Sequence, residues 1–390
     1  MKFLLEILGM TNQCNLRCSY CDWVKDEYIA LGKNEISNVR RNLSSIKKVL
    51  DENYKETQLI EYSGGEPLVY PEIVNILLEQ FKDKWIRIIT NGVAINDDIL
   101  SSVSNHGKTF LAISLDGCNL EANNARFQGN NKLFQHVLKN IDKVVERKIP
   151  LMLLCTLSKY NIDYFPDYIE YLQNKYSEAI EAGMLVMPTH YVTNYSKDNG
   201  VPSKEQVEKF EKFINGKGMD YPIISNIKEH YYCLIQYAKH NPKPYGCKIN
   251  EWNISMHFRK NEIIDAGKFL NFGCGMRGVE ENGFFNINDK KDVDTMINII
   301  NSPDYYMDFE NQSSEALHKD RLSGYNDLDE NCYGKCFVDW TIIDLILRGI
   351  VNYEDAKKWF VMFRSQSVEK FVMEYKNNQK AKKLISQFSH

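Results

Sequence analysis

Three cysteines near the N-terminus have the spacing of a metal-binding loop. Cys14, Cys18 and Cys21 are separated by three and by two residues and lie among polar neighbours such as Asn12 and Asp22. Three thiolates on one loop can bind three irons of a 4Fe–4S cluster and leave the fourth iron open to another ligand. A zinc site would need a fourth ligand nearby, and Asp22 is a poor one. The loop therefore predicts a 4Fe–4S cluster with one open iron.

Two further segments carry side chains that suit a small charged ligand. Gly64 and Gly65 allow a ligand to approach the backbone closely, and the carboxylate of Glu66 beside them can accept from an ammonium group. Ser114 and Arg126 together suit a carboxylate, because the guanidinium fork can bind it bidentately. Taken singly, the first segment also fits a glycine-rich turn and the second a helix cap with a surface arginine.

A second set of cysteines lies much further along the chain. Its members are Cys247, Cys274, Cys332 and Cys336. Four thiolates can fully ligate a second 4Fe–4S cluster, and a structural zinc at the same residues is the alternative. Of the other cysteines, Cys155 and Cys233 are interpreted as packing residues, and Cys118 follows a predicted strand end, where it could line a site.

Repeated strand–helix units must position these residues. Short β-branched runs alternate with longer amphipathic runs in the first half of the chain, which is typical of a parallel sheet. The predicted strands are residues 3–8, 58–62, 86–90, 109–115, 150–157 and 184–188, and the predicted helices are residues 35–53, 71–81, 96–104, 132–146, 162–176 and 203–213. Six such units predict a partial (β/α)6 TIM barrel with its chemistry at the carboxyl ends of the strands.

Beyond about residue 215 the alternation stops. Breakpoints at 215–218 and 241–246 precede two hairpin-like segments, and the tail is apolar-periodic and Lys-rich. We therefore expect an α/β barrel at residues 1–217, a small α+β auxiliary-cluster domain at 218–345 and C-terminal helices at 346–390.

Composition excludes several classes of protein. Apolar residues at 43% of 390 can build a large core, so a mainly disordered chain is excluded. A net charge of -4 lacks the basic footprint of a nucleic-acid binder. The chain shows no signal peptide and no run of apolar residues long enough to cross a membrane. We expect a cytoplasmic protein whose thiols stay reduced, with no nucleic-acid or membrane partner.

The cysteine loop, the Gly64–Glu66 segment, the end of the third predicted strand and the Ser114–Arg126 segment together resemble the radical S-adenosylmethionine (SAM) superfamily. Its signature Cys-x-x-x-Cys-x-aromatic-Cys is present as residues 14–21, and the resemblance implies that Tyr20 packs against the adenine of SAM. Gly64, Gly65 and Glu66 match the Gly-Gly-Glu-Pro element, which in the family binds the SAM amino group.

Two other segments extend the resemblance along the barrel. Ser114, in a Ser-x-Asp-Gly element, and the downstream Arg126 match the residues that bind the SAM carboxylate in relatives. Thr90 and Asn91, at the end of the third strand, are placed by the resemblance in the same cofactor site. The resemblance implies that a flavodoxin or ferredoxin-type protein reduces the cluster, that SAM is cleaved to a 5′-deoxyadenosyl radical, and that this radical abstracts hydrogen from a substrate.

The distal cysteines resemble the auxiliary-cluster region of the SPASM and twitch subfamilies. A full SPASM pattern has more cysteines, and the segment after Gly283 lacks one where that pattern has it. We therefore expect one auxiliary cluster at Cys247, Cys274, Cys332 and Cys336, as 4Fe–4S, with 2Fe–2S or zinc as alternatives.

The resemblance favours a ribosomally synthesised peptide as the substrate, undergoing crosslinking or epimerisation (RiPP maturation). A leader-binding module has no room before a first strand that starts near Lys2. A peptide substrate is therefore expected to be short, to be recognised by the barrel and the C-terminal region, or to be delivered by a separate leader-binding protein. The alternatives are a twitch-type small-molecule dehydrogenase and a sulfatase-maturase-like protein modifier. A non-enzymatic iron–sulfur scaffold would explain the cysteines but not Glu66, Ser114 and Arg126 at strand ends.

Four residues are candidates for proton transfer. Asp116, Cys118, His190 and Asp265 follow predicted strands or a hairpin and are within reach in principle. No proton-transfer role is assigned to any of them, because geometry must come before chemistry.

Overall fold

A computed structural model describes residues 4–8, 10–11, 13–21, 33–190, 200–225, 231, 234–235, 253–257, 268–272 and 285–301. The predicted auxiliary ligands Cys247, Cys274, Cys332 and Cys336, the candidate Asp265 and the expected C-terminal helices lie outside the described residues.

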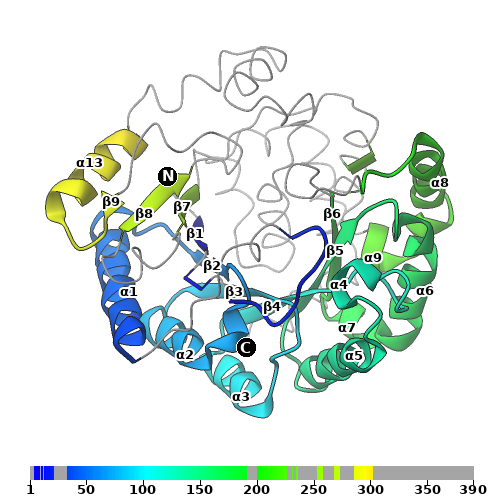
Figure 1. Cartoon of the computed structure of the whole chain (residues 1–390), viewed down its shortest axis with the longest axis horizontal. Coiled ribbons are helices and arrows are strands. Elements are labelled where there is room, and N and C mark those ends of the chain that lie inside the picture. The colour runs from blue at the N-terminus through cyan, green and yellow to red at the C-terminus, as the bar shows by residue number, and fades with distance from the viewer. Residues whose placement is uncertain are drawn as a thin grey trace, which may run out of the picture.

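The described strands form one open sheet (Figure 1). The strands are β1 (Leu4–Leu8), β2 (Leu59–Ser63), β3 (Trp85–Thr90), β4 (Thr109–Ser114), β5 (Leu151–Leu157), β6 (Leu185–His190), β7 (Asn253–His257), β8 (Lys268–Phe272) and β9 (Phe285–Asn286). Their order is β6-β5-β4-β3-β2-β1-β7-β8-β9, parallel from β6 to β7 and antiparallel beyond. Because β6 and β9 are the two edges, the α/β partial barrel expected from the sequence is confirmed.

Helices cover the outer side of this curved sheet (Figure 1). They are α1 (Lys33–Asn53), α2 (Pro71–Gln80), α3 (Asp97–His106), α4 (Asn124–Phe127), α5 (Asn131–Glu146), α6 (Phe165–Lys175), α7 (Ser177–Glu181), α8 (Lys204–Asn215), α9 (Pro222–Ser225) and α13 (Lys290–Asn301), with short 3-10 turns at Pro67–Val69, Ile162–Tyr164 and Lys217–Asp220. No described helix is long and apolar enough to cross a membrane.

Local sequence signals explain where individual helices begin and end. The Asn96 side chain accepts from the Ile99 N–H at 3.0 Å, and Gly107 ends α3 at φ +70°. Ser203 and Gln206 form a reciprocal capping box at the start of α8. These contacts satisfy backbone groups that a helix end leaves without intrahelical partners.

Each strand has one face toward the helices and one toward the concave side of the sheet. A Cβ on Gly92 would lie 3.0 Å from Ile113 of β4 and 3.2 Å from Val137 of α5, so Ile113 faces the helix layer. Ile113 pairs with Thr90 in register, so Ile86 and Ile88, which alternate with Arg87, share the helix-facing side. The core is thus formed between the sheet and its helices, and the opposite face of the strands lines the interior of the partial barrel.

The strand Asn253–His257 adds to the sheet beyond the six predicted strand–helix units. It pairs in parallel with β1, so β1 has neighbours on both sides. The sequence pattern did not reveal this pairing, because β7 is a five-residue run whose next described element is its antiparallel partner β8 and not a helix. The β7–β8 pair is antiparallel, as a hairpin in this region predicts.

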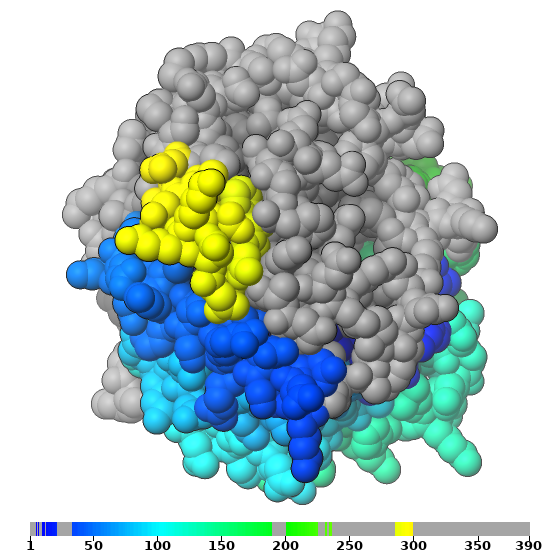
Figure 2. Space-filling model, turned by 60° about the vertical axis from the view of Figure 1, so that its left-hand side comes forward, coloured from blue at the N-terminus to red at the C-terminus, as the bar shows by residue number. Residues whose placement is uncertain are grey.

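The segment around α13 packs against α1. Asn288 donates to Asn42 at 2.8 Å and accepts from Ser45 at 2.7 Å, and Met296 is fully buried. Figure 2 shows this segment, in yellow, lying on the blue surface of the first helices. Residues 285–301 therefore extend the helix layer on the β1 side of the sheet.

Candidate functional site

The predicted site residues gather at the carboxyl ends of β1 to β4. Residues 13–21 follow β1, Gly64 to Glu66 follow β2, Asn91 follows β3, and Asp116 follows β4. In parallel sheets this edge is where ligands bind. Cys14, Cys18 and Cys21 are all half-buried there.

Backbone hydrogen bonds attach the cysteine loop to the end of β2. The Gly65 N–H donates to the Thr11 carbonyl at 2.9 Å, and the Glu66 N–H donates to the Gln13 carbonyl at 2.7 Å. Gly64 has φ +151°, a conformation that side-chain-bearing residues rarely adopt. The two glycines thus allow the second loop to run alongside the first.

The carboxylate of Glu66 links the end of β2 to the end of β3. It accepts from the Thr90 hydroxyl at 2.6 Å, the Asn91 N–H at 2.7 Å and the Leu68 N–H at 3.0 Å. Burial raises the pKa of Glu66, and these three donors oppose the rise. A carboxylate has about four acceptor positions. Three are filled by described residues, and one on Oε2 is left for an external donor.

Asn91 connects the same end of β3 to the first cysteine. Its side-chain Nδ2 donates to Asn15 Oδ1 at 2.7 Å and lies 3.5 Å from the sulfur of Cys14. The Leu16 N–H also points at that sulfur, at 3.4 Å. Burial raises the pKa of Cys14, whereas both N–H donors favour its thiolate form.

The short helix α4 holds the other end of the loop. The Ser19 N–H donates to the Ala125 carbonyl at 2.8 Å, and the Gln128 side chain donates to the Arg17 carbonyl. The sulfur of Cys18 lies 4.0 Å from the carbonyl oxygen of Arg126. Burial raises the pKa of Cys18 to about 12, so metal binding here must displace a proton.

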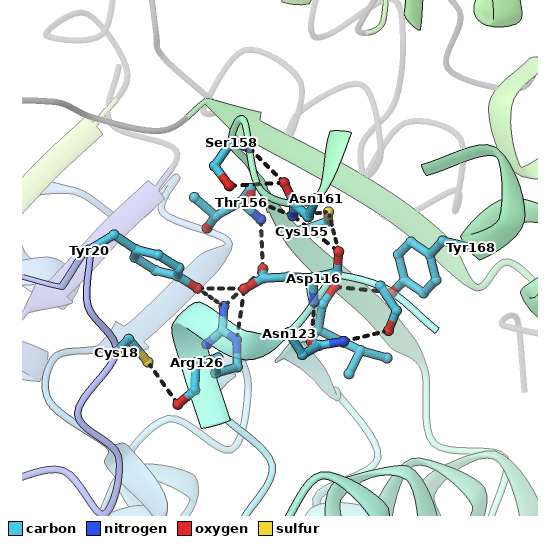
Figure 3. A network of polar contacts seen from close by, with 12 residues as sticks. Cys18, Tyr20, Asp116, Asn123, Arg126, Cys155, Thr156, Ser158, Asn161 and Tyr168 are labelled. Carbon is cyan, nitrogen blue, oxygen red and sulfur yellow. Dashed lines mark hydrogen bonds and ion pairs between the residues drawn. The ribbon is translucent and has the colours of Figure 1, made fainter. Parts of the chain in front are cut away.

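A buried polar network joins Tyr20, Asp116 and Arg126 (Figure 3). The Tyr20 hydroxyl donates to Asp116 Oδ2 at 2.7 Å. Arg126 donates from Nε to Oδ2 at 3.2 Å and from Nη2 to Oδ1 at 3.1 Å, and its Nη2 also donates to the Tyr20 oxygen. The Thr156 N–H donates to Asp116 Oδ1 at 2.9 Å. Asp116 and Arg126 are 3% and 6% exposed, so the pair is shielded from solvent screening.

Asn123 and Gly117 fix the backbone beneath this network. The Asp116 N–H donates to the Asn123 side chain, which donates in turn to the Gly117 carbonyl, both at 2.8 Å. A Cβ on Gly117 would lie only 2.4 Å from the Cβ of Ala122. Glycine is therefore required where the β4 loop crosses the segment that leads into α4.

These residues fit a three-cysteine 4Fe–4S cluster and SAM. Within the described ranges, no three His, Cys, Asp or Glu side chains converge on a single-ion site. A cube does not require that, because each thiolate binds a different iron. Glu66 keeps an acceptor position suited to an ammonium group, and Nη1 of Arg126 has no acceptor among the described residues.

Some predicted site residues lie apart from this cluster of contacts. Ser114 is half-buried at the end of β4, and the Arg126 bonds described above go to Asp116 and Tyr20, not to Ser114. Cys118 packs against the core, and burial and the nearby Asp167 of α6 raise its pKa. His190 is the last residue of β6.

Sequence reasoning missed Asn15, Asn123 and Gln128, which hold the cysteine loop and the β4 end. Their residue type gives no distinctive signal in the sequence. The only available pointer is their proximity along the chain to Cys14 and to Arg126.

A comparison with protein families gives a match within the first half of the chain. The model of the Radical SAM superfamily matches residues 8–172. This segment contains the cysteine loop and every residue of the network around Asp116.

Curated relatives match over part of the chain. A Methanosarcina barkeri Fe-coproporphyrin III synthase is 26% identical over 172 residues, 43% of this chain and 41% of the relative. The Bacillus subtilis sporulation killing factor maturation protein SkfB is 26% identical over 182 residues, 45% of this chain and 41% of the relative. A Clostridium botulinum GTP 3′,8-cyclase is 26% identical over 212 residues, 53% of this chain and 64% of the relative. The match thus spans less than two thirds of each of these relatives.

Solved structures match over most of the chain. Streptococcus suis SuiB bound to S-adenosylmethionine has a TM-score of 0.57 at 14% identity, covering 87% of this chain and 74% of that one. The protein anSMEcpe with bound AdoMet and Cp18Cys peptide has a TM-score of 0.53 at 16% identity, covering 86% of this chain and 89% of that one. At these identities the similarity shows a shared fold.

Proposed function

Residues 8–172 of this chain are a radical SAM domain, and from that premise we propose that the protein is a radical SAM enzyme that modifies a peptide. When bound, the cluster and SAM supply one-electron cleavage of the sulfonium and a 5′-deoxyadenosyl radical that abstracts hydrogen from the substrate. The protein supplies binding, orientation and exclusion of water.

The chain's own residues have separate tasks in this proposal. Cys14, Cys18 and Cys21 hold the cluster, and the N–H groups of Leu16 and Asn91 stabilise the Cys14 thiolate. The open acceptor position of Glu66 takes the SAM ammonium group. Nη1 of Arg126 takes the SAM carboxylate, together with Ser114 at the end of β4. Tyr20 packs against the adenine.

One observation carries the proposal. The cysteine loop is bonded directly to the Gly65–Glu66 segment, to Asn91 and to α4, so the cluster ligands and the groups for SAM form one connected unit. A scaffold protein would need the cysteines but not a buried acid and a buried arginine on either side of them.

SAM cleavage tests the proposal directly. The reconstituted chain, reduced with dithionite and given SAM, should release 5′-deoxyadenosine. The triple replacement of Cys14, Cys18 and Cys21 by Ala should abolish release. Cys155→Ala, at a buried cysteine of β5 whose sulfur contacts the Asp116 carbonyl but not its carboxylate, should retain it. Cluster-loaded wild-type protein that leaves SAM intact would contradict the proposal.

We propose that Cys247, Cys274, Cys332 and Cys336 hold one auxiliary 4Fe–4S cluster. The fully loaded chain should then contain about eight irons. Replacing Cys332 and Cys336 should spare SAM cleavage without substrate yet stop product formation. Finding about four irons and one zinc would establish the structural zinc alternative instead.

A peptide is the preferred substrate because structures of both neighbours include one. SuiB has been crystallised bound to precursor peptide SuiA, with a TM-score of 0.54 to this chain, and anSMEcpe with the Cp18Cys peptide. The SkfB relative is a maturation protein. Crosslinking or epimerisation of a ribosomally made peptide is the reaction proposed, with a separate leader-binding protein and a flavodoxin or ferredoxin as partners.

A small-molecule substrate is the second candidate, supported by the GTP 3′,8-cyclase and Fe-coproporphyrin III synthase relatives. Deuterium transfer separates the two. Candidate precursor peptides made with perdeuterated residues should transfer deuterium into 5′-deoxyadenosine. Transfer only from a deuterated nucleotide or porphyrin would favour the second candidate.

A further inference from the structure

Asp116 was a candidate for proton transfer, and its contacts indicate a different task. Its carboxylate accepts from Tyr20, from Arg126 twice and from the Thr156 N–H, at 2.7 to 3.2 Å. These four bonds fill the roughly four acceptor positions of a carboxylate. Asp116 therefore keeps no acceptor position for a substrate, unlike Glu66, which has one left on Oε2.

The partners of Asp116 come from two different parts of the site. Tyr20 lies between Cys18 and Cys21 on the cysteine loop. Arg126 lies in α4, and its own carbonyl oxygen is 4.0 Å from the sulfur of Cys18. The guanidinium carbon of Arg126 also lies 5.6 Å from the centre of the Tyr20 ring. Asp116 therefore bonds the cluster loop and the proposed carboxylate-binding arginine at the same time (Figure 3).

The direction of these bonds determines which edge of Arg126 is available. Nε and one side of Nη2 face Asp116, and the other side of Nη2 faces the Tyr20 oxygen. A rotated guanidinium would present a different edge to an incoming carboxylate, since its five donors form a rigid fork.

We infer that Asp116 is a positioning residue that fixes the Tyr20 end of the cluster loop and Nη1 of Arg126 in one geometry, and so sets the SAM carboxylate relative to the cluster. This inference rests on the proposed radical SAM function. It assigns to Tyr20 a second task, because its hydroxyl is the part of the loop that Asp116 holds.

Two variants of the 390-residue chain test this role. Asp116→Asn keeps the shape and removes the charge, and Tyr20→Phe keeps the ring and removes only the hydroxyl. Tyr168→Phe is the matched control, because its buried hydroxyl bonds the Leu115 carbonyl at 3.2 Å near the same strand end without contacting Tyr20 or Arg126.

The first readout uses the cluster-free chain. Amide hydrogen exchange across residues 13–21 should become several-fold faster in Asp116→Asn and Tyr20→Phe and stay unchanged in Tyr168→Phe, because only the first two release the loop.

The second readout uses the loaded chain. Iron content should match wild type, while the SAM-induced change in the EPR spectrum of the reduced cluster is altered and 5′-deoxyadenosine release falls roughly 10- to 100-fold, as expected for misplaced groups. The double variant should release 5′-deoxyadenosine no more slowly than the more impaired single variant, because both substitutions disrupt the same Tyr20–Asp116 contact.

The outcomes are distinct. Wild-type exchange, EPR response and cleavage rate in both variants would overturn the inference even if the protein is a SAM-cleaving enzyme. Should Asp116→Asn fail to fold, Tyr20→Phe alone decides by the same criteria. Wild-type protein that never cleaves SAM would refute the proposed function, whereas unchanged exchange in the cluster-free variants would refute the Asp116 contact independently.

Discussion

The side-chain amide of Asn91 lies 3.5 Å from the sulfur of Cys14, and the backbone N–H of the same residue donates to Glu66 at 2.7 Å. One residue at the end of β3 thus contacts both a proposed cluster ligand and the proposed ammonium acceptor. The two contacts use different atoms, so mutation can separate them.

Asn91→Ala should lower the reduction potential of the cluster. The substitution removes the amide donor to Cys14 and to Asn15 but keeps the backbone bond to Glu66. Fewer N–H donors at a ligating sulfur favour the oxidised cluster. An EPR-monitored redox titration measures the shift, and iron content should be unchanged. An unaltered potential would show that this amide does not act on the cluster.

Glu66→Gln should weaken SAM binding with little effect on iron content. The amide loses the charge that attracts an ammonium group, and its NH2 faces the donors of Thr90 or Asn91. Leaving one of these buried donors unsatisfied should cost about 1–3 kcal/mol of folding free energy. Equilibrium binding of SAM and chemical unfolding of the cluster-free chain measure the two effects. Leu68→Ala tests whether a packing change near Glu66 alone weakens binding.

The affinity for SAM should also depend on pH through Glu66. Burial raises its folded pKa above the ordinary value of 4.5, and only the ionised form attracts the ammonium. As the pH falls, wild-type affinity should therefore decline at a higher pH than an ordinary glutamate would cause. Glu66→Gln should lack this decline, and the same decline in the variant would assign it to another group.

The sequence predicted the barrel well because its strands are buried β-branched runs and its helices are amphipathic. The runs at β2 to β5 agree with the expected ranges within a few residues at each end. Pairing of β7 with β1 could not be predicted, since a five-residue strand whose next described element is another strand gives no sign of its parallel neighbour.

Residue types at the site were predicted better than their partners. The parallel strands β2, β3 and β4 end at the same edge of the sheet, and the segments that follow them carry Glu66, Asn91 and Arg126. The pairing of Asp116 with Arg126 and Tyr20 depends on the path of the loop through Gly117 and α4, which no local pattern encodes. A free acid at a strand end and a buried, fully bonded one look identical in sequence.

Gly117→Ala should disturb SAM binding as well as stability. The added methyl would lie 2.4 Å from Ala122, and relieving that overlap must shift the β4 loop or the segment before α4, which carries Arg126. Overpacking of this kind costs about 1–3 kcal/mol.

Gly107→Ala is the matched control for this substitution. A Cβ on Gly107 meets nothing within 4 Å, but its φ of +70° makes the added side chain costly. Gly107 precedes the amino end of β4, whereas Arg126 follows the carboxyl end of that strand. Both variants should unfold at lower denaturant concentration, and only Gly117→Ala should also lose SAM affinity. Equal affinity in the two variants would show that the path of the β4 loop does not control Arg126.

Removing either partner of an ion pair on the concave face of the sheet should strongly destabilise the chain. Glu61 of β2 and Arg87 of β3 are paired in register and form a salt bridge with both side chains 7% exposed. Their neighbours Ile86 and Ile88 face the helices, so the pair lies toward the interior of the partial barrel.

Removing one charge leaves the other buried without compensation. Glu61→Leu and Arg87→Leu should each lower the free energy of unfolding by about 3–5 kcal/mol, whereas the double replacement should recover most of that loss, because no isolated charge remains. Chemical unfolding of the cluster-free chain measures all three. Lys47→Leu, whose bridges to Asp51 and Asp83 are on the surface, should change stability by less than about 1 kcal/mol. A double variant as unstable as the sum of the two single ones would mean that each residue is held by contacts other than the pair.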